Sequence, residues 1–243
     1  MSRGIAIVGV GGLGAPAAVA LAAAGLDRLT LVDPDVVESS NLPRQPLFGD
    51  RDLGRPKVEA ASERLCRERP GLRIESVVAR VDPASAVALL SGHAAILDGT
   101  DGLESKVLLN EVAVETGIPL VHAGAVGLEG QLFSILPGSS ACLRCLFVEL
   151  PDPDDMPTCQ QSGILGPVVG AVGLAAAREA LAMYRGLRPR LADRLAIFSG
   201  RDLLWRTIEL RRHPRCPACS GIPVSRLRNP APDAKIGAGS SNF

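Results

Sequence analysis

The chain is poor in aromatic residues and carries no net charge. Aromatic residues make up 3% of its 243 residues, and 26 basic residues balance 26 acidic ones. A general nucleic-acid binder presents a basic surface to the phosphates, and single-strand binders add aromatic side chains for base stacking. We therefore expect no nucleic-acid partner.

The chain also lacks a secretion signal and a long apolar run. Met1-Ser2-Arg3-Gly4 leads at once into a strand-like run, without a long apolar region or a small-residue cleavage site. The longest apolar stretch, Gly163 to Ala177, is interrupted by glycine and shorter than the roughly 18 to 20 residues of a membrane span. We interpret it as part of a buried helix and expect a cytoplasmic protein without a membrane partner.

What is present is a regular alternation of short aliphatic runs with segments of helical periodicity. The expected strands are Ile5–Val8, Leu29–Val32, Ile74–Val78, Ala95–Leu97 and Leu120–Val121, and the expected helices include Gly14–Ala24 and Lys57–Arg69. This α/β pattern predicts a Rossmann-like, mainly parallel sheet with helices on both faces.

After Gly130 the pattern changes. Strands are expected at Gln131–Leu136, Leu195–Ser199 and Leu203–Leu210, with a long helix over Gly166–Tyr184 between the first two. Since no crossover helix separates the last two strands, we expect the sheet to continue in mixed or antiparallel order.

One domain accounts for most of the chain. Its 47% hydrophobic content suffices for a single core, so we expect one domain over residues 1–221. Residues 222–243, rich in Pro, Gly and Ser, are expected to form a disordered tail. Pro151–Pro157 holds three prolines and three acids, which predicts a mobile loop.

A glycine-rich loop follows the first expected strand. Its candidate phosphate-contacting residues are Gly9, Gly11, Gly12 and Gly14. Glycines let the backbone approach phosphates, and an acid after the second strand, here Asp33, suits ribose hydroxyls. These features alone would fit an NAD(P)-dependent oxidoreductase. Arg44 and Lys57 instead indicate a triphosphate whose charge must be offset during reaction.

Two Cys-x-x-Cys pairs supply a second signal. Cys142 and Cys145 form the first pair, and Cys216 and Cys219 form the second. This spacing lets two thiolates take neighbouring corners of a tetrahedron, so the pairs together predict a closed structural zinc site between distant segments. The alternatives are two redox pairs or disulfides, which the cytosol disfavours.

These motifs occur in an order that resembles the ThiF/MoeB/HesA family, whose members are similar to the adenylation domain of ubiquitin-activating enzymes. The resemblance runs from Ile5 to Cys219 and rests on Gly11-Gly12-Leu13-Gly14, Asp33, Ser40-Asn41-Leu42-Pro43-Arg44-Gln45, Gly54-Arg55-Pro56-Lys57, Asp98-Gly99-Thr100-Asp101, both cysteine pairs, and Cys159 before Gly163-Ile164-Leu165-Gly166-Pro167. It implies an enzyme, usually a homodimer, that uses Mg-ATP to adenylate the C-terminal glycine of a ubiquitin-like sulfur carrier ending in Gly-Gly. Such carriers serve thiamine, molybdopterin or related biosynthesis.

The resemblance also implies residue roles. Asp33 would hold the ribose, and Ser40, Asn41, Arg44 and Lys57 would contact the nucleotide, with the two cations offsetting charge at the phosphates. Asp101 would hold magnesium.

Cys159 is expected to accept an acyl group or to form a mixed acyl disulfide during sulfur transfer from a persulfide donor, with a spectator thiol as the alternative.

Two positions depart from the family pattern. Only three residues precede Gly4, where the family has an arginine-bearing arm that reaches the neighbouring subunit, and Gly102 stands where the family usually has Asn. Besides the oxidoreductase, adenylation of a peptide or another carboxylate and a non-catalytic scaffold stay open.

Four further side chains are interpreted as structural. Cys66 is expected to be a packed core thiol, and His93 and His122 to be histidines with satisfied hydrogen bonds, although His122 could approach the active face. His213 precedes the second cysteine pair and is expected near the zinc.

Overall fold

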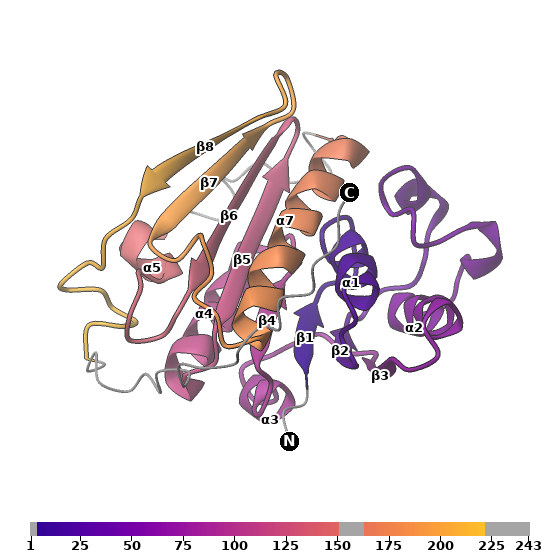
Figure 1. Ribbon diagram of the computed structural model, residues 1–243, viewed down its shortest axis with the longest axis horizontal. Helices are drawn as coiled ribbons and strands as arrows, with labels where there is room; N and C mark the ends of the chain where they lie inside the picture. Colours follow the sequence, from indigo (N-terminus) through magenta and orange to yellow (C-terminus); the bar gives the residue numbers. More distant parts are fainter. Residues whose placement is uncertain (1–3, 151–162, 222–243) are drawn as a thin grey trace, which may run out of the picture.

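The structure, a computed structural model, describes residues 4–150 and 163–221. An eight-stranded sheet runs through them in the order β3-β2-β1-β4-β5-β6-β7-β8 (Figure 1). The expected loop over Pro151–Pro157, Cys159 and the expected tail over 222–243 lie outside the described residues.

The first five strands of the sheet are parallel to one another, as predicted. They are β1 (Ile5–Val8), β2 (Arg28–Val32), β3 (Arg73–Val77), β4 (Ala95–Asp98) and β5 (Leu120–Val126). The strands β1 and β4 are buried at every position, which explains their nearly continuous aliphatic sequences. The expected end of β5 at Val121 was wrong, because the strand continues to Val126 in its pairing with β6.

The remaining strands are antiparallel. They are β6 (Glu129–Ile135), β7 (Arg194–Ser199) and β8 (Leu204–Glu209), and β5, β6, β7 and β8 pair in that order. The predicted change from a parallel to an antiparallel sheet is therefore confirmed. Every residue of the edge strand β8 is exposed.

Two apolar layers cover the sheet. One side packs against α1 (Gly14–Ala23), α2 (Lys57–Glu68) and α7 (Gly166–Tyr184), and α7 lies along the sheet beside α1 (Figure 1). The other side packs against α3 (Ala86–Leu90), α4 (Leu103–Thr116) and α5 (Leu143–Leu146). Two short 3₁₀ helices, η1 (Ser39–Arg44) and η2 (Asp50–Asp52), connect β2 to α2.

The helix α7 has the bounds that its periodicity predicted. Its 19 residues are long and apolar enough to cross a membrane by length and composition, but half of its most apolar window is buried within the fold. Gly173 lets it approach α1, since a Cβ there would lie 2.5 Å from the Leu13 carbonyl oxygen. The described structure therefore uses α7 as a core helix.

Candidate functional site

The glycine loop joins β1 to α1 and touches the turn after β4. Gly9 has a φ of +87°, and a Cβ there would lie 2.7 Å from the Gly99 carbonyl carbon. A Cβ on Gly14 would collide with the Gly9 carbonyl oxygen. Only glycine therefore permits the loop to fold this closely at the carboxyl ends of β1 and β4.

Asp33 follows β2 and bonds to the glycine loop. Its side chain is 4% exposed, and its Oδ2 accepts the Val10 N–H at 2.6 Å while its Oδ1 accepts the Asp35 N–H at 2.9 Å. Burial raises the pKa of Asp33, while the Lys57 ammonium and the two backbone donors act in the opposite direction. A carboxylate offers about four lone-pair sites, so Asp33 keeps acceptors for ribose hydroxyls.

Lys57 begins α2 and reaches back toward β2. Its side chain is 7% exposed, and its Nζ donates to Asp35 Oδ2 at 2.7 Å. The Lys57 N–H also donates to the Asp35 carbonyl oxygen at 3.0 Å. Asp35 was not among the sequence candidates, although it stands only two residues after Asp33. Asp35 holds the Lys57 ammonium near Asp33 and the glycine loop.

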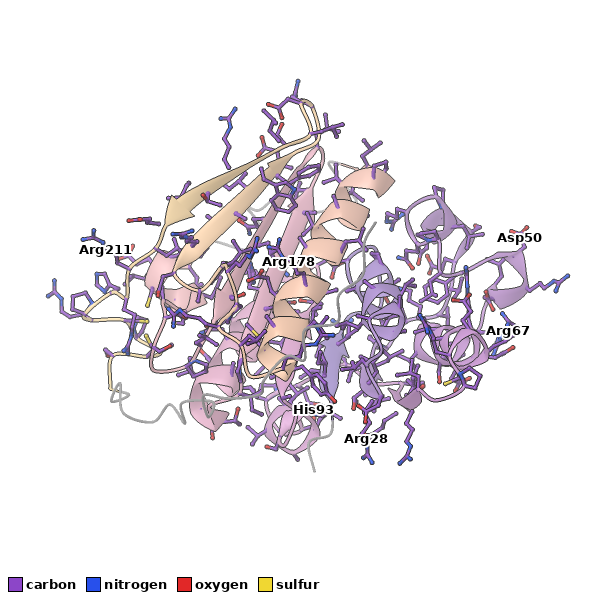
Figure 2. The ribbon with its side chains drawn as sticks, viewed as in Figure 1. Arg28, Asp50, Arg67, His93, Arg178 and Arg211 are labelled. Atoms are coloured by element: carbon purple, nitrogen blue, oxygen red, sulfur yellow. The ribbon has the colours of Figure 1, made fainter. Side chains whose placement is uncertain are left out.

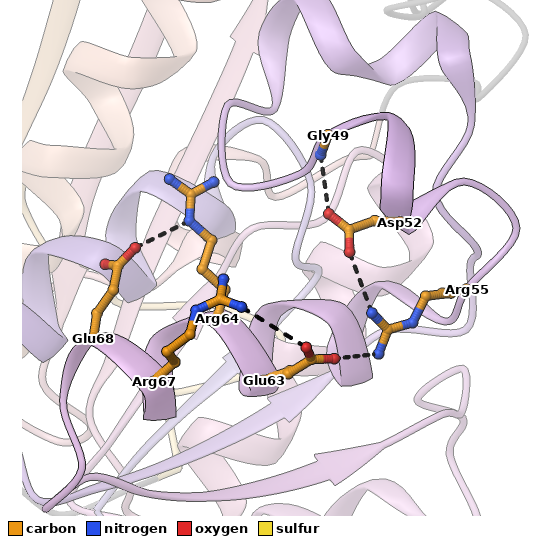
Figure 3. Close-up of polar contacts among 7 residues, drawn as sticks. All are labelled: Gly49, Asp52, Arg55, Glu63, Arg64, Arg67 and Glu68. Atoms are coloured by element: carbon orange, nitrogen blue, oxygen red, sulfur yellow. Dashed lines mark hydrogen bonds and ion pairs between the residues drawn. The ribbon is translucent and has the colours of Figure 1, made fainter.

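An exposed ion-pair network ties the segment before α2 to that helix (Figure 3). Arg55 Nη2 lies 2.7 Å from Glu63 Oε2, and Arg55 Nη1 lies 3.3 Å from Asp52 Oδ1. Arg64 adds hydrogen bonds to the Pro46 and Leu47 carbonyl oxygens. Single exposed pairs contribute about 0–1 kcal/mol, so the network adds little to the stability of this segment.

The helix η1 carries the other predicted nucleotide contacts. Arg44 Nη1 donates to the Ser40 carbonyl oxygen at 2.7 Å, and Asn41 Nδ2 donates to Ser40 Oγ at 3.1 Å. A Cβ on Gly166, at the start of α7, would lie 3.0 Å from the Pro43 carbonyl oxygen. The chain therefore holds η1 against α7, and Arg44 is engaged by its own helix.

Gln45 connects η1 to the glycine loop. Its side chain is 3% exposed, and its Nε2 lies 3.6 Å from where a Gly11 Cβ would stand. Its buried Oε1 has no hydrogen-bond partner among the described residues. An unpaired buried acceptor beside a glycine cradle fits a ligand that brings hydroxyl or amino donors, as a nucleoside does. Gln45 belongs to a motif that carries the family resemblance, but no role in the site was predicted for it from the sequence.

Asp101 lies on the turn between β4 and α4. It is exposed, and it follows Gly99, whose backbone packs against Gly9 and Gly14. Gly102 is the N-cap of α4 and contributes no side-chain cap. A carboxylate at this edge is the hard oxygen ligand that magnesium prefers when it is shared with phosphates. The residues present thus fit Mg-ATP.

The four cysteines predicted to bind zinc lie together. Their sulfur atoms are all within 4.8 Å of one another, and the pairs Cys142–Cys145, Cys142–Cys216 and Cys145–Cys219 are separated by 3.8, 3.6 and 3.5 Å. A disulfide requires about 2.05 Å, so these are free thiols in the structure. The first pair flanks the start of α5, and the second follows β8.

This donor set fits zinc. A tetrahedral ion with Zn–S bonds of about 2.3 Å needs sulfurs about 3.8 Å apart, close to the separations found. Burial, followed by the charges of the neighbouring thiolates, raises the pKa of the Cys142 thiol, so a cation is needed for all four to ionise together. The described residues complete the set without an open position for a substrate.

The histidines behave differently from one another. His93, labelled in the lower part of Figure 2, is satisfied as predicted. Its Nδ1 lies 2.8 Å from the Leu90 carbonyl oxygen and its Nε2 lies 2.8 Å from Thr30 Oγ1. The prediction that His122 is satisfied was wrong, because neither of its buried ring nitrogens makes a hydrogen bond of good geometry among the described residues. The His213 carbonyl oxygen accepts the Cys216 N–H at 3.0 Å. Cys66 is half-buried, and its Sγ lies 3.5 Å from the Leu72 carbonyl oxygen.

Comparison with known proteins identifies relatives over nearly the whole chain. The model of the ThiF family matches residues 2–218. The SAMP-activating enzyme E1 of Haloferax volcanii is 39% identical over 229 residues, which cover 94% of the chain and 84% of that enzyme. The sulfur carrier protein ThiS adenylyltransferase of Escherichia coli is 36% identical over 218 residues, covering 89% of the chain and 86% of that protein.

A solved structure shares the fold. Escherichia coli MccB, crystallised with MccA-N7isoASN, has a TM-score of 0.79 and 20% sequence identity. The alignment covers 90% of the chain and 67% of the MccB chain. At this identity the likeness concerns the fold alone.

Proposed function

The chain belongs to the ThiF family, and from that membership we propose that it is an ATP-dependent adenylyltransferase for a ubiquitin-like sulfur carrier protein. The carrier would end in Gly-Gly and be activated at its C-terminal carboxylate. One observation carries the proposal. The glycine loop, Asp33 and the turn bearing Asp101 meet at the carboxyl ends of β1, β2 and β4. They do so in a chain that is 36% identical to a ThiS adenylyltransferase over 89% of its length.

The proposed reaction is one displacement at phosphorus. A carboxylate oxygen of the carrier forms a bond to the α-phosphorus of ATP while the bond from that phosphorus to the oxygen bridging to the β-phosphate breaks. The pyrophosphate leaves with the electron pair, and the carrier becomes an acyl-adenylate. A C-terminal carboxylate with a pKa of about 3.5 is already ionised at neutral pH, so no general base is required. The protein must instead position the reactants and neutralise charge.

The residues divide this work. Asp33 would hold the ribose hydroxyls beside the glycine loop, and Arg44 and Lys57 would offset the charge that develops on the phosphates. Lys57 is paired with Asp35 at 2.7 Å, so it must turn from a carboxylate to a phosphate as the nucleotide binds. Asp101 would hold magnesium, which when bound neutralises phosphate oxygens and orients the leaving group.

Several features of the proposal extend beyond the adenylation site. Cys142, Cys145, Cys216 and Cys219 would hold a structural zinc ion that joins the start of α5 to the segment after β8. We further propose a cytoplasmic homodimer in which the Cys159 thiolate attacks the acyl-adenylate, forming a thioester with the carrier as the carbon–oxygen bond to AMP breaks and AMP leaves. The terminal sulfur of a persulfide donor then attacks the thioester carbonyl and releases Cys159, which leaves a mixed acyl disulfide between carrier and donor. The adenylation step does not require Cys159.

Pyrophosphate exchange tests the proposal directly. The purified protein with Mg-ATP and a Gly-Gly-ending carrier should exchange labelled pyrophosphate into ATP, because labelled pyrophosphate can replace the released pyrophosphate and reverse formation of the enzyme-bound acyl-adenylate. The matched control is the same carrier without its last glycine, which should support little exchange. Intact mass of the carrier should show the adenylate directly.

Other results would replace the proposal. Exchange with a short peptide but with no carrier would assign the protein to peptide adenylation. Binding of a nicotinamide dinucleotide without binding of ATP would favour an oxidoreductase.

A further inference from the structure

A buried charged cluster lies beneath the turn that carries Asp101. It consists of Asp98 at the end of β4, Lys106 on α4 and His122 on β5, which are 0%, 9% and 2% exposed. Asp98 stands in a motif of the family resemblance and His122 was predicted as able to approach the active face, but no role in the site was predicted for either, and none for Lys106. A buried carboxylate and a buried ammonium group destabilise a fold unless their contacts compensate for the lost hydration, so the contacts of Asp98 and Lys106 indicate what the cluster does.

The two oxygens of Asp98 face different partners. Oδ2 accepts a hydrogen bond from Lys106 Nζ at 3.1 Å and lies 3.2 Å from His122 Nδ1. Lys106 Nζ also donates to the Ala123 carbonyl oxygen at 2.6 Å, which anchors the ammonium to β5. Oδ2 therefore faces the fold, where α4 and β5 hold it from two directions.

Oδ1 of Asp98 faces the turn. It accepts the Thr100 N–H at 3.0 Å and the Thr100 hydroxyl at 2.7 Å. Thr100 stands between Gly99, which packs against Gly9 and Gly14, and the exposed Asp101. One carboxylate thus links the packed β4 and α4 to the chain segment that meets the glycine loop.

The cluster keeps Asp98 ionised. Burial raises the pKa of Asp98, but the Lys106 ammonium and the Thr100 hydroxyl outweigh it, and the value falls to about 2. Burial also lowers the pKa of His122, so His122 is neutral and the cluster contains one negative and one positive group. A simple ion pair would need only Lys106. The two bonds to Thr100 are what such a pair does not require.

We propose that Asp98 is a positioning residue for the adenylation site, and that it holds Thr100 so that Asp101 is placed for magnesium and nucleotide before either binds. This inference rests on the proposed function. The fold thereby orders in advance a turn that would otherwise be ordered only on binding, and a site ordered in advance loses less conformational entropy when its ligand binds.

The experiment removes the Thr100 hydroxyl and leaves the buried charges in place. Thr100→Val keeps the shape of the side chain, whereas Thr100→Ser keeps the hydroxyl. The matched control is Ser134→Ala, which removes another hydroxyl that bonds to a buried carboxylate. Ser134 Oγ donates to Oε2 of Glu179, on α7, at 3.1 Å. ATP binding is measured by calorimetry over a magnesium series without carrier, together with kcat and KM for pyrophosphate exchange and Tm.

We expect the magnesium dependence of ATP binding to change in Thr100→Val alone. Thr100→Val should raise the magnesium concentration for half-maximal ATP binding about fivefold, as expected for one lost hydrogen bond, and should raise the KM for Mg-ATP more than it lowers kcat. Thr100→Ser should lie within about twofold of the unmodified protein. Ser134→Ala should lower Tm without changing the magnesium dependence.

Three results would overturn the positioning role. They are a Thr100→Val variant that matches the unmodified protein, a Thr100→Ser variant shifted as far as Thr100→Val, and a Ser134→Ala variant with the same magnesium shift. If the unmodified protein itself binds no Mg-ATP, the proposed function fails, and that failure is distinct from these three.

Discussion

The cysteine cluster differs from the proposed adenylation site, which we call the nucleotide edge and which comprises Asp33, Arg44, Lys57 and Asp101. The difference lies in what the side chains contact before a ligand binds. In the cluster, four sulfur atoms from distant segments lie within 4.8 Å of one another and converge on one point. At the nucleotide edge, Lys57 is paired with Asp35, Arg44 bonds to the Ser40 carbonyl oxygen, and Asp33 bonds to Val10. The cluster has the geometry of its bound state, whereas the cations of the nucleotide edge hold protein partners.

This difference teaches how each region can use its ligand. A closed cluster gains nothing by rearranging, so a metal bound there would contribute to the free energy of folding. Cations proposed to act on a triphosphate would otherwise lack a partner when the site is empty, and the exposed carboxylate of Asp35 supplies one that can be exchanged. Metal loss should therefore damage stability, and loss of an edge cation should damage chemistry.

Breaking the cluster should produce the largest effect. Cys216→Ser removes a buried ligand and should lower Tm by about 10 °C or more, because the binding energy of a structural zinc ion adds to the free energy of unfolding. Cys66→Ser, which removes a half-buried thiol outside the cluster, is the matched control and should keep about one zinc per chain. Metal analysis of protein purified without added zinc, with Tm, makes the measurement. Protein with four free thiols and no zinc in the cluster would refute the site.

Breaking the nucleotide edge should leave the fold intact. Lys57→Ala, Arg44→Ala and Asp101→Ala should each lower pyrophosphate exchange by about 10²- to 10³-fold, the usual cost of losing one group that stabilises transition-state charge. Tm should change little, since removing Lys57 leaves Asp35 in contact with water. Arg67→Ala on α2, whose side chain is 69% exposed, is the control and should exchange normally. Robust exchange in all three variants would remove the assigned roles.

Replacing His122, in the buried cluster beneath the Asp101 turn, should have a smaller effect on the free energy of unfolding, and this effect should depend on pH. Burial lowers the pKa of His122 below its ordinary value of 6.5, so the unfolded chain binds the proton more readily than the folded protein does. The stability that neutral His122 contributes is complete above pH 6.5 and is lost as the pH falls, by at most about 1.4 kcal/mol per pH unit. Urea unfolding of His122→Gln between pH 7 and 5 should show a shallower decline than the unmodified protein.

Asp98 supplies an internal control for that comparison. Its pKa falls from 3.8 to about 2 on folding, so its contribution is complete above pH 3.8 and does not affect the slope between pH 7 and 5. Thiolates of the cluster also bind protons in acid, which is why the difference between the two proteins carries the result. Equal slopes between pH 7 and 5 would show that His122 does not titrate on unfolding.

Local patterns predicted most of the fold. Fully buried parallel strands are aliphatic along their whole length, so β1, β2 and β4 were found within a residue or two. The helix α4 was not foreseen. Its buried face contains Lys106 and Asn110, which interrupt the apolar stripe by which an amphipathic helix is recognised. These buried polar residues have structural partners. Lys106 bonds to Asp98 beneath the site, and Asn110 accepts the Leu143 N–H near the cysteines.

By itself, the sequence determined the chemistry at each motif, because glycine spacing, Cys-x-x-Cys spacing and the order of Asp33, Arg44 and Lys57 depend on neighbours along the chain. The tertiary structure alone decided the partners. Asp35 holds Lys57 across 22 positions, Cys142 meets Cys216 across 74, and Asp98 lies between α4 and β5. These contacts depend on which strands pair and which helix covers them, so packing of distant segments, and no local pattern, placed the charges beneath the nucleotide edge.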